Sequence, residues 1–495
     1  MIFNSVKFFV FFITVLLIFF LIPKKARLYW LLAASYYFYM SWNKKYALLI
    51  LFSTLATYSG AILIDRSEGS IKKRKAVLGS VVFFNLLILG VFKYLGFLTD
   101  TVNSFLKFFG LSASLGKLNI LLPVGISFYV FQALGYIIDV YRGDIKAEKN
   151  IFRYALFVSF FPQLVAGPIE RSGNLLKQIR ELPEKKLFDL KRMTSGVILM
   201  IYGFFLKMVI ADRAALLVNP VFENCRGYGA VELIIAAVSF SIQIYCDFAG
   251  YSFIACGSAK IMGFSLMENF KAPYLAVSIQ DFWRRWHISL STWFRDYLYI
   301  PLGGNREGKL KKYRNLMITF LVSGLWHGAA WTFVIWGGLH GLMQVAGGIT
   351  KKYRETVIKK MGADTSCFSF RFLRVMITFI LTCAAWVFFR ASSAGDAFYF
   401  FRQIFLRPDI WNLTNGGMLE LGLERFELNI FIIALFVLFA FDIIREKLDL
   451  TIDKWLMKQN LWFRWLVMIG LILFIFVFGE YGSTFDPQQF MYFQF

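Results

Sequence analysis

Runs of about 20 apolar residues recur along this chain, and they constrain the fold more than any other feature. Apolar side chains make up 58% of the 495 residues, more than the roughly 45–50% of a soluble protein. In a bilayer, every backbone N–H and C=O must find its hydrogen-bond partner within the protein, so such runs form helices. The sequence therefore predicts an all-α protein, a polytopic membrane bundle of about 10–12 transmembrane helices with re-entrant and interfacial helices.

The apolar runs also predict how the chain is divided. No Gly-, Ser- or Pro-rich linker interrupts them, so we expect one transmembrane domain over residues 1–479 and a tail over residues 480–495. The expected spans are 6–22, 27–42, 46–64, 76–98, 118–140, 194–218, 230–256, 370–391, 429–445 and 463–479, with a pair of spans or half-helices over 315–348. The segment 151–168 is short and contains Pro162 and Gly167, which favours a re-entrant segment. The first run lacks a small-residue cleavage site, so we expect it to be retained as a span.

The charged residues indicate orientation and partners. The formal net charge is +23, and the Lys and Arg residues lie mostly in short loops between the apolar runs. The positive-inside rule and anionic lipid headgroups explain this pattern, so membrane lipids are expected partners and nucleic acid is not. The order of basic loops places both termini outside the cell membrane. The five cysteines show no paired spacing, so we expect neither a disulfide nor a metal site.

All three histidines of the chain lie in one stretch, from Gln280 to Gly341. They are His287, His327 and His340, and five of the thirteen tryptophans lie close to the first two. Histidine is the side chain best suited to moving protons near neutral pH. Their concentration indicates an active site, although so rare a residue also clusters by chance.

Two predicted elements carry these histidines. The segment 281–300 is expected to be one amphipathic helix at the membrane interface, with His287 at the edge of its apolar side. Its apolar stripe consists of Trp283, Trp286, Leu290, Trp293, Phe294 and Tyr297. The Gly-broken segment 315–348 has basic residues at both ends, so it enters the membrane and returns, and it carries His327 deep into the bilayer.

A buried histidine in such a setting suits general-base chemistry. A low dielectric keeps the imidazole neutral, and a neutral imidazole can remove a proton from an attacking hydroxyl. The alternative for His327 is a hydrogen bond between helices. Asp247 lies in the span 230–256, one turn from Gln243, and an ionisable group there has either a functional or a structural role.

Long motifs in this stretch resemble the membrane-bound O-acyltransferase family. They are WRRWHISLSTWFRDYLYIPLGGNR and SGLWHGAAWTFVIWGGLHG, and FVSFFPQLVAGPIER and YCDFAGYSFIACGSAKIMGF are similar to the same family. The resemblance is to its bacterial branch, which contains alginate and peptidoglycan O-acetylation proteins and a D-alanyl transfer protein of lipoteichoic acid. It extends over much of a catalytic core at about residues 120–345.

The resemblance implies a helical bundle around a central tunnel, in a bacterial cell membrane. It implies acyl transfer from a cytoplasmic thioester to a hydroxyl on the outer side. His327 matches the essential histidine of the family and His287 matches its second characteristic histidine. His340 matches a less essential position, which is expected to be structural.

The C-terminal FMYFQF is similar to a tail signature of the alginate and peptidoglycan acetylation proteins. The resemblance implies that Tyr492 accepts the acyl group and passes it to an extracytoplasmic, SGNH-like acetyltransferase, with a polysaccharide as final acceptor. The phenol has an unperturbed pKa of about 10, so this step needs a base. The alternative for Tyr492 is an aromatic anchor at the membrane interface.

Arginines near the histidines bear on the identity of the acyl donor. Acetyl-coenzyme A is the expected donor, with no cofactor bound permanently. Arginines on the expected cytoplasmic face suit its phosphates: Arg284, Arg285, Arg295 and Arg306. Positive-inside topology explains the same residues, and a basic face also suits an acyl-carrier protein. The alternatives for the whole chain are D-alanyl transfer to teichoic acid, a transporter or channel, and a scaffold.

Overall fold

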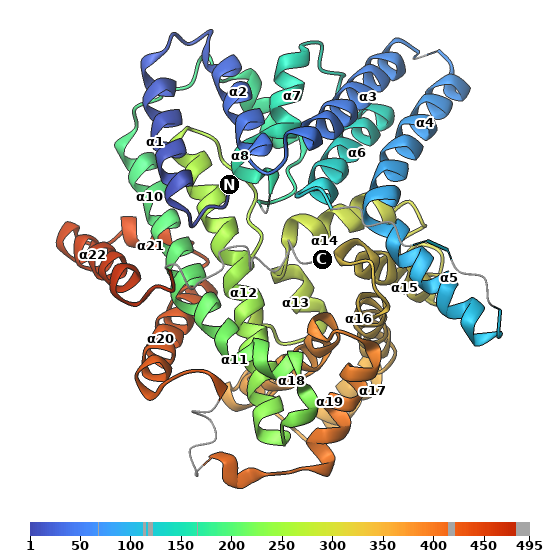
Figure 1. Ribbon diagram of the computed structural model, residues 1–495, viewed down its shortest axis with the longest axis vertical. Helices are drawn as coiled ribbons and strands as arrows, with labels where there is room; N and C mark the ends of the chain where they lie inside the picture. Colours follow the sequence, from blue (N-terminus) through green and yellow to red (C-terminus); the bar gives the residue numbers. More distant parts are fainter. Residues whose placement is uncertain (68, 112–114, 117–121, 166, 414–420, 482–495) are drawn as a thin grey trace. The chain divides into compact units, whose positions relative to one another are not determined.

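The computed structural model describes residues 1–67, 69–111, 115–116, 122–165, 167–413 and 421–481 (Figure 1). Every regular element within these ranges is a helix. The all-α prediction is therefore confirmed. Tyr492 lies outside the described residues.

Seven helical segments of the described chain are long and apolar enough to cross a membrane. They are Lys44–Arg66, Ile71–Phe108, Leu190–Glu223, Ala230–Ile261, Phe368–Arg390, Arg425–Leu448 and Leu461–Phe478. Other expected spans form shorter helices, namely α1 (Val6–Leu21), α2 (Arg27–Met40) and α6 (Ile126–Arg142). The prediction of a polytopic helical membrane protein is confirmed, with seven such segments where about 10–12 spans were predicted.

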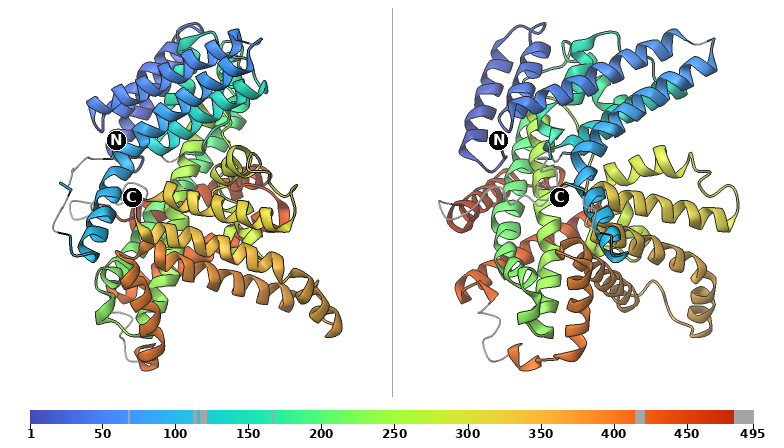
Figure 2. Two further views of the ribbon diagram at one scale, coloured as in Figure 1. Left: turned by 90° about the vertical axis from the view of Figure 1, so that its right-hand side faces the viewer. Right: turned by 45° about the vertical axis from the view of Figure 1, so that its right-hand side comes forward.

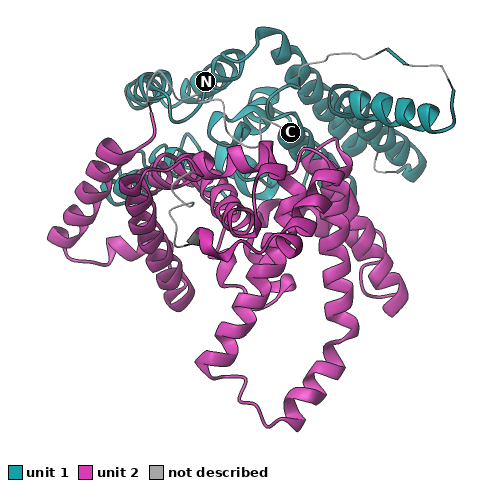
Figure 3. Ribbon diagram, turned by 60° about the horizontal axis from the view of Figure 1, so that its bottom comes forward, with its two compact units in different colours: residues 1–197, 254–267 teal, residues 198–253, 268–495 magenta. Residues whose placement is uncertain are grey.

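The chain forms two compact units (Figure 3). Unit 1 contains residues 1–197 and 254–267, and unit 2 contains residues 198–253 and 268–495. All of the predicted site residues that the structure describes belong to unit 2.

In unit 1, α3 (Ala47–Arg66) packs against α4 (Ile71–Leu89), α6 and α7 (Ile151–Ser159). The hydroxyl of Tyr154 on α7 donates a hydrogen bond to Thr57 Oγ1 on α3 at 2.6 Å. After α7 the chain breaks at Phe160 and continues in α8 (Phe161–Leu164), with Pro162 in its first turn. The helix over this segment is thus interrupted two residues before Pro162, and the re-entrant arrangement stays a prediction.

Unit 2 contains the helices that follow α10, together with the end of α10 and without the end of α12, which belongs to unit 1. α10 (Leu190–Phe204), the π-helical segment η4 (Phe205–Ala211) and α11 (Asp212–Glu223) follow one another without a break. The other principal elements are α12 (Ala230–Ile261), α13 (Ile279–Arg285), α14 (Ile288–Phe294), α15 (Lys309–His327), α16 (Trp331–Ile349), α17 (Lys351–Lys360), α18 (Phe368–Arg390), α19 (Ala394–Leu406), α20 (Arg425–Leu448), α21 (Ile452–Met457) and α22 (Leu461–Phe478).

The prediction of one continuous helix over 281–300 was wrong. The segment divides into α13, α14 and a π-helical turn over Arg295–Tyr299, and the first break lies at Trp286 and His287. His287 has a φ of 42°, in the left-handed region that non-glycine residues rarely adopt. Tertiary contacts stabilise this break. A projection of the sequence onto a regular helix therefore contains no information about it.

α15 and α16 form a tight hairpin, joined by residues 328–330 (Figure 2). The two helices approach most closely where glycines face the opposite backbone. A Cβ on Gly324 would collide with the carbonyl oxygen of Phe333, and a Cβ on Gly337 would collide with that of Phe320. Small residues allow this approach in membrane bundles. The glycines predicted to interrupt the segment 315–348 therefore permit helix–helix contact.

We predict that Gly337→Ala separates this hairpin. The added methyl group meets backbone atoms, which cannot rotate away, so the free energy of unfolding should fall by about 1–3 kcal/mol. Thermal unfolding in detergent measures the change. Gly347→Ala is the matched control on α16, because a Cβ there meets nothing within 4 Å. Equal melting temperatures for the two variants would contradict the prediction.

Candidate active site

The hairpin and the segment before it bring the three histidines into one cluster. His327 is the last residue of α15, His340 lies on α16, and His287 precedes α14. The rings of His287 and His327 are 6.3 Å apart, and the Trp336 ring lies 5.0 Å from both His327 and His340. All three histidines are buried. The structure thus unites residues that are up to 53 positions apart in the sequence.

Aromatic rings surround this cluster, which we call the histidine cluster (His287, His327 and His340). Phe248 of α12 lies 4.6 Å from the His287 ring, and Phe389 of α18 lies 5.5 Å from the His327 ring. Trp386 of α18 stacks on Trp336 at 5.4 Å. The sequence motifs did not indicate the two α18 rings, although their spacing of three residues puts them on one helix face. Such a shell excludes water and strengthens the electrostatic interactions inside it.

Asn269 supports the unusual backbone at His287. The Ile288 N–H donates to the Asn269 carbonyl at 2.9 Å, and the Ser289 hydroxyl donates to Asn269 Oδ1 at 2.6 Å. These bonds offset part of the strain of the left-handed backbone conformation at His287. They also direct the His287 side chain toward the other two histidines of the cluster. Burial lowers the pKa of His287, which favours the neutral imidazole.

Trp283 determines which nitrogen of His340 carries the proton. Its indole N–H donates to His340 Nδ1 at 3.2 Å. Since Nδ1 accepts this bond, the proton of the neutral ring is on Nε2. His340 is therefore positioned by α13, the same helix that leads into His287.

Asp247 forms part of a buried ion-pair cluster. Lys207 of η4 lies 2.7 Å from Asp247 Oδ1 on α12 and 2.7 Å from Asp212 Oδ1 on α11. All three side chains are buried. Lys207 gives a structural reason for the burial of Asp247, since a buried carboxylate needs an opposite charge nearby. Lys207 was not among the predicted site residues, although an ionisable residue within the apolar run 194–218 is a signal that the sequence contains.

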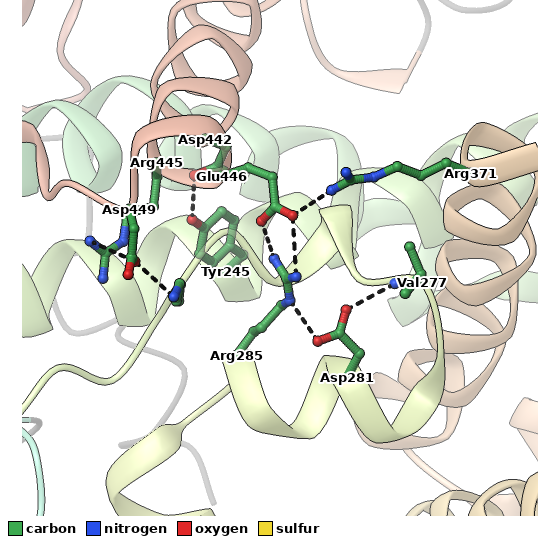
Figure 4. Close-up of polar contacts among 10 residues, drawn as sticks. Tyr245, Val277, Asp281, Arg285, Arg371, Asp442, Arg445, Glu446 and Asp449 are labelled. Atoms are coloured by element: carbon green, nitrogen blue, oxygen red, sulfur yellow. Dashed lines mark hydrogen bonds and ion pairs between the residues drawn. The ribbon is translucent and has the colours of Figure 1, made fainter. Parts of the chain in front are cut away.

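The four arginines expected to bind the donor have different surroundings, and Arg306 is exposed. Arg284 is exposed and has no ion-pair partner among the residues that the structure describes, and Arg295 is exposed beside Asp296 at 2.8 Å. Arg285 instead lies between Asp281, at 2.9 Å, and Glu446 of α20 (Figure 4).

Glu446 also pairs with Arg371 of α18, so these charges connect α13, α18 and α20 (Figure 4). Nearby on α20, Asp442 accepts a hydrogen bond from the Tyr245 hydroxyl at 2.9 Å. The guanidinium of Arg285 is therefore engaged within the protein, whereas those of Arg284 and Arg295 face outward. Arg285 holds α13 in place, which in turn positions Trp283 and His287.

We predict that Trp283→Phe changes the electronic state of His340. Loss of the indole donor leaves a buried acceptor, at a cost of about 1–3 kcal/mol. Because the chain has three histidines, ¹⁵N-histidine labelling gives a simple spectrum, in which the His340 Nδ1 resonance, assigned with His340→Gln, should shift. The exposed Trp462 supplies the control, Trp462→Phe. An unchanged His340 resonance would rule out the hydrogen bond.

We predict that substitution by Met destabilises the protein at Arg285 and does not destabilise it at the neighbouring Arg284. Arg285→Met removes hydrogen bonds to two carboxylates and should lower the free energy of unfolding by about 1.5–3 kcal/mol. Arg284→Met should leave stability unchanged, because the side chain is exposed. Thermal unfolding of both variants tests this, and equal losses of stability would contradict it.

The chain matches known proteins over the region that contains this site. The model of the membrane-bound O-acyltransferase family matches residues 145–389. The probable alginate O-acetylase AlgI of Pseudomonas syringae pv. tomato is 39% identical over 376 residues, which is 76% of this chain and 69% of the relative. The peptidoglycan O-acetyltransferase of Helicobacter pylori is 35% identical, over 72% of this chain and 70% of the relative. The teichoic acid D-alanyltransferase of Bacillus subtilis is 30% identical, over 48% of this chain and 62% of the relative.

Proposed function

Since this chain belongs to the membrane-bound O-acyltransferase family, we propose that it moves an acetyl group from a cytoplasmic thioester across the membrane to a cell-surface polysaccharide pathway. It is a multi-pass membrane O-acyltransferase of the branch that contains alginate O-acetylases and peptidoglycan O-acetyltransferases. The main support for the proposal is the histidine cluster, in which buried imidazoles lie close together within an aromatic shell.

In the proposed reaction, His327 is the general base. It removes the proton of the Tyr492 hydroxyl while the phenolic oxygen attacks the thioester carbonyl. The carbon–sulfur bond then breaks, and the thiolate leaves and takes up a proton, so that an acetyl-tyrosine ester and a free thiol result. The aromatic shell supports this role, because a low dielectric favours the neutral imidazole that a base requires.

His287 is the second participant of this proposal. Its ring lies 6.3 Å from that of His327, and its Asn269-supported backbone keeps it there. We assign it the positioning of the reacting groups and the protonation of the leaving thiolate. His340 orients the shell through Trp336 and Trp283 and has no proton-transfer role in this scheme.

Acetyl-coenzyme A is the proposed donor. Arg284 and Arg295 are the arginines suited to its phosphates, because both are exposed, whereas Arg285 is half-buried between Asp281 and Glu446. The acetyl group of Tyr492 then passes to a separate extracytoplasmic transferase, which acetylates a hydroxyl of the polysaccharide. This second transfer regenerates the tyrosine.

D-alanyl transfer from a carrier protein is the alternative donor chemistry. A teichoic acid D-alanyltransferase matches about half of this chain. The broader match to O-acetylases and the fused FMYFQF tail favour acetyl transfer.

Acyl labelling tests the proposal. We predict that purified protein incubated with radiolabelled acetyl-coenzyme A carries the label on its C-terminal peptide. Tyr492→Phe should abolish the label, and His327→Ala should slow its appearance by about 10²–10⁴-fold, as expected for loss of a general base.

Tyr481→Phe is the matched control for loss of a tail phenol and should be labelled normally. Equal labelling of Tyr492→Phe and wild type would overturn the tyrosine ester. Labelling by a D-alanyl carrier protein alone would establish the alternative donor.

A further inference from the structure

The π-helical segment η4 binds the backbone where the C-terminal tail begins. π-Helical turns inside α-helices disturb the regular pattern of backbone hydrogen bonds and often occur at functional sites. The Glu480 N–H donates to the carbonyl oxygen of Met208, which lies in η4, at 2.9 Å. Glu480 directly follows α22 and Gly479, so this bond holds the residue from which the tail departs.

A side-chain ion pair reinforces this backbone contact. Arg213 lies on α11, directly after η4, and its guanidinium contacts Glu480 Oε1 at 2.7 Å. The Arg213 side chain is 5% exposed and that of Glu480 is 22% exposed. Charge-assisted hydrogen bonds with so little exposure are stronger than surface ion pairs. Glu480 is therefore held at two points, one on its backbone and one on its side chain.

The element that holds Glu480 is itself firmly fixed. Lys207 of η4 pairs with Asp247 of α12 and with Asp212, the residue before Arg213. The Phe205 ring of η4 packs against Phe474 of α22 at 5.8 Å. Movement of η4 would separate buried charges, which is costly. The buried ion-pair cluster thus provides a rigid base for the contacts to Glu480.

We propose that Arg213, Glu480 and the Met208 carbonyl form a latch that positions the acyl-carrying tail, an inference that rests on the proposed role of Tyr492. About a dozen residues separate Glu480 from Tyr492, which is enough to reach ~40 Å when extended. Fixing the point from which a segment departs raises the effective concentration of its end at a defined target. Arg213 and Glu480 are positioning residues for transfer to Tyr492.

A charge exchange tests the latch. Glu480→Arg places two like charges together and should slow acetylation of Tyr492 several-fold, with an unchanged KM for acetyl-coenzyme A. Adding Arg213→Glu should restore the rate, because the exchanged pair has the same attraction. Glu480→Ala, which removes the pair without repulsion, gives the same test if the double variant fails to fold. Glu355→Gln neutralises an exposed carboxylate on α17 as the control and should leave the rate unchanged.

Hydrogen exchange of the peptide that contains Glu480 reports the latch independently of the reaction. Its amide should exchange faster in Glu480→Arg and Glu480→Ala than in wild type. Faster exchange with a normal rate of Tyr492 acetylation would overturn the positioning role and leave the proposed function intact. Wild-type exchange rates in both variants would overturn the latch. A third outcome is that Tyr492→Phe is labelled as strongly as wild type while hydrogen exchange still shows the latch. This result would overturn the proposed function and, with it, the role of the latch in acetyl transfer.

Discussion

The close contact of α15 and α16 is the constraint on which the candidate site depends. Gly324 and Gly337 allow the two helices to approach to a distance that side chains would prevent. This contact brings both His327 and His340 to within 5.0 Å of the Trp336 ring. A wider hairpin would separate the imidazoles and admit water or lipid between them. The aromatic shell around the histidines therefore depends on two missing methyl groups.

Buried and half-buried charges perform most of the remaining positioning. Arg285 and Glu446 tie α13 to α20, and Lys207 ties η4 to α12. Each pair spans elements that are distant in the sequence, and each charge is balanced where desolvation would otherwise oppose burial. Ion pairs in unit 2 thus orient helices that are distant in the sequence.

The strained backbone at His287 shows how local preference yields to tertiary contact. A regular amphipathic helix over 281–300 satisfies the apolar pattern, yet it would direct His287 along a continuous helix face. The structure breaks the helix and turns His287 toward Phe248 and His327, with Asn269 accepting two hydrogen bonds from the residues that follow. Strain held in this way is common at functional sites.

By itself, the sequence determined the helical membrane class, the interrupted character of 151–168 and 315–348, and the stretch that contains the candidate site. These properties depend on apolar run length, prolines, glycines and motif identity, which are local. Only the tertiary structure decided that the helix breaks at Trp286 and His287, and that Arg285 pairs with Glu446. It also decided that Lys207 lies beside Asp247, and that Trp386 and Phe389 complete the aromatic shell. These depend on contacts between residues far apart in the chain, and neither periodicity nor composition records which distant residues meet.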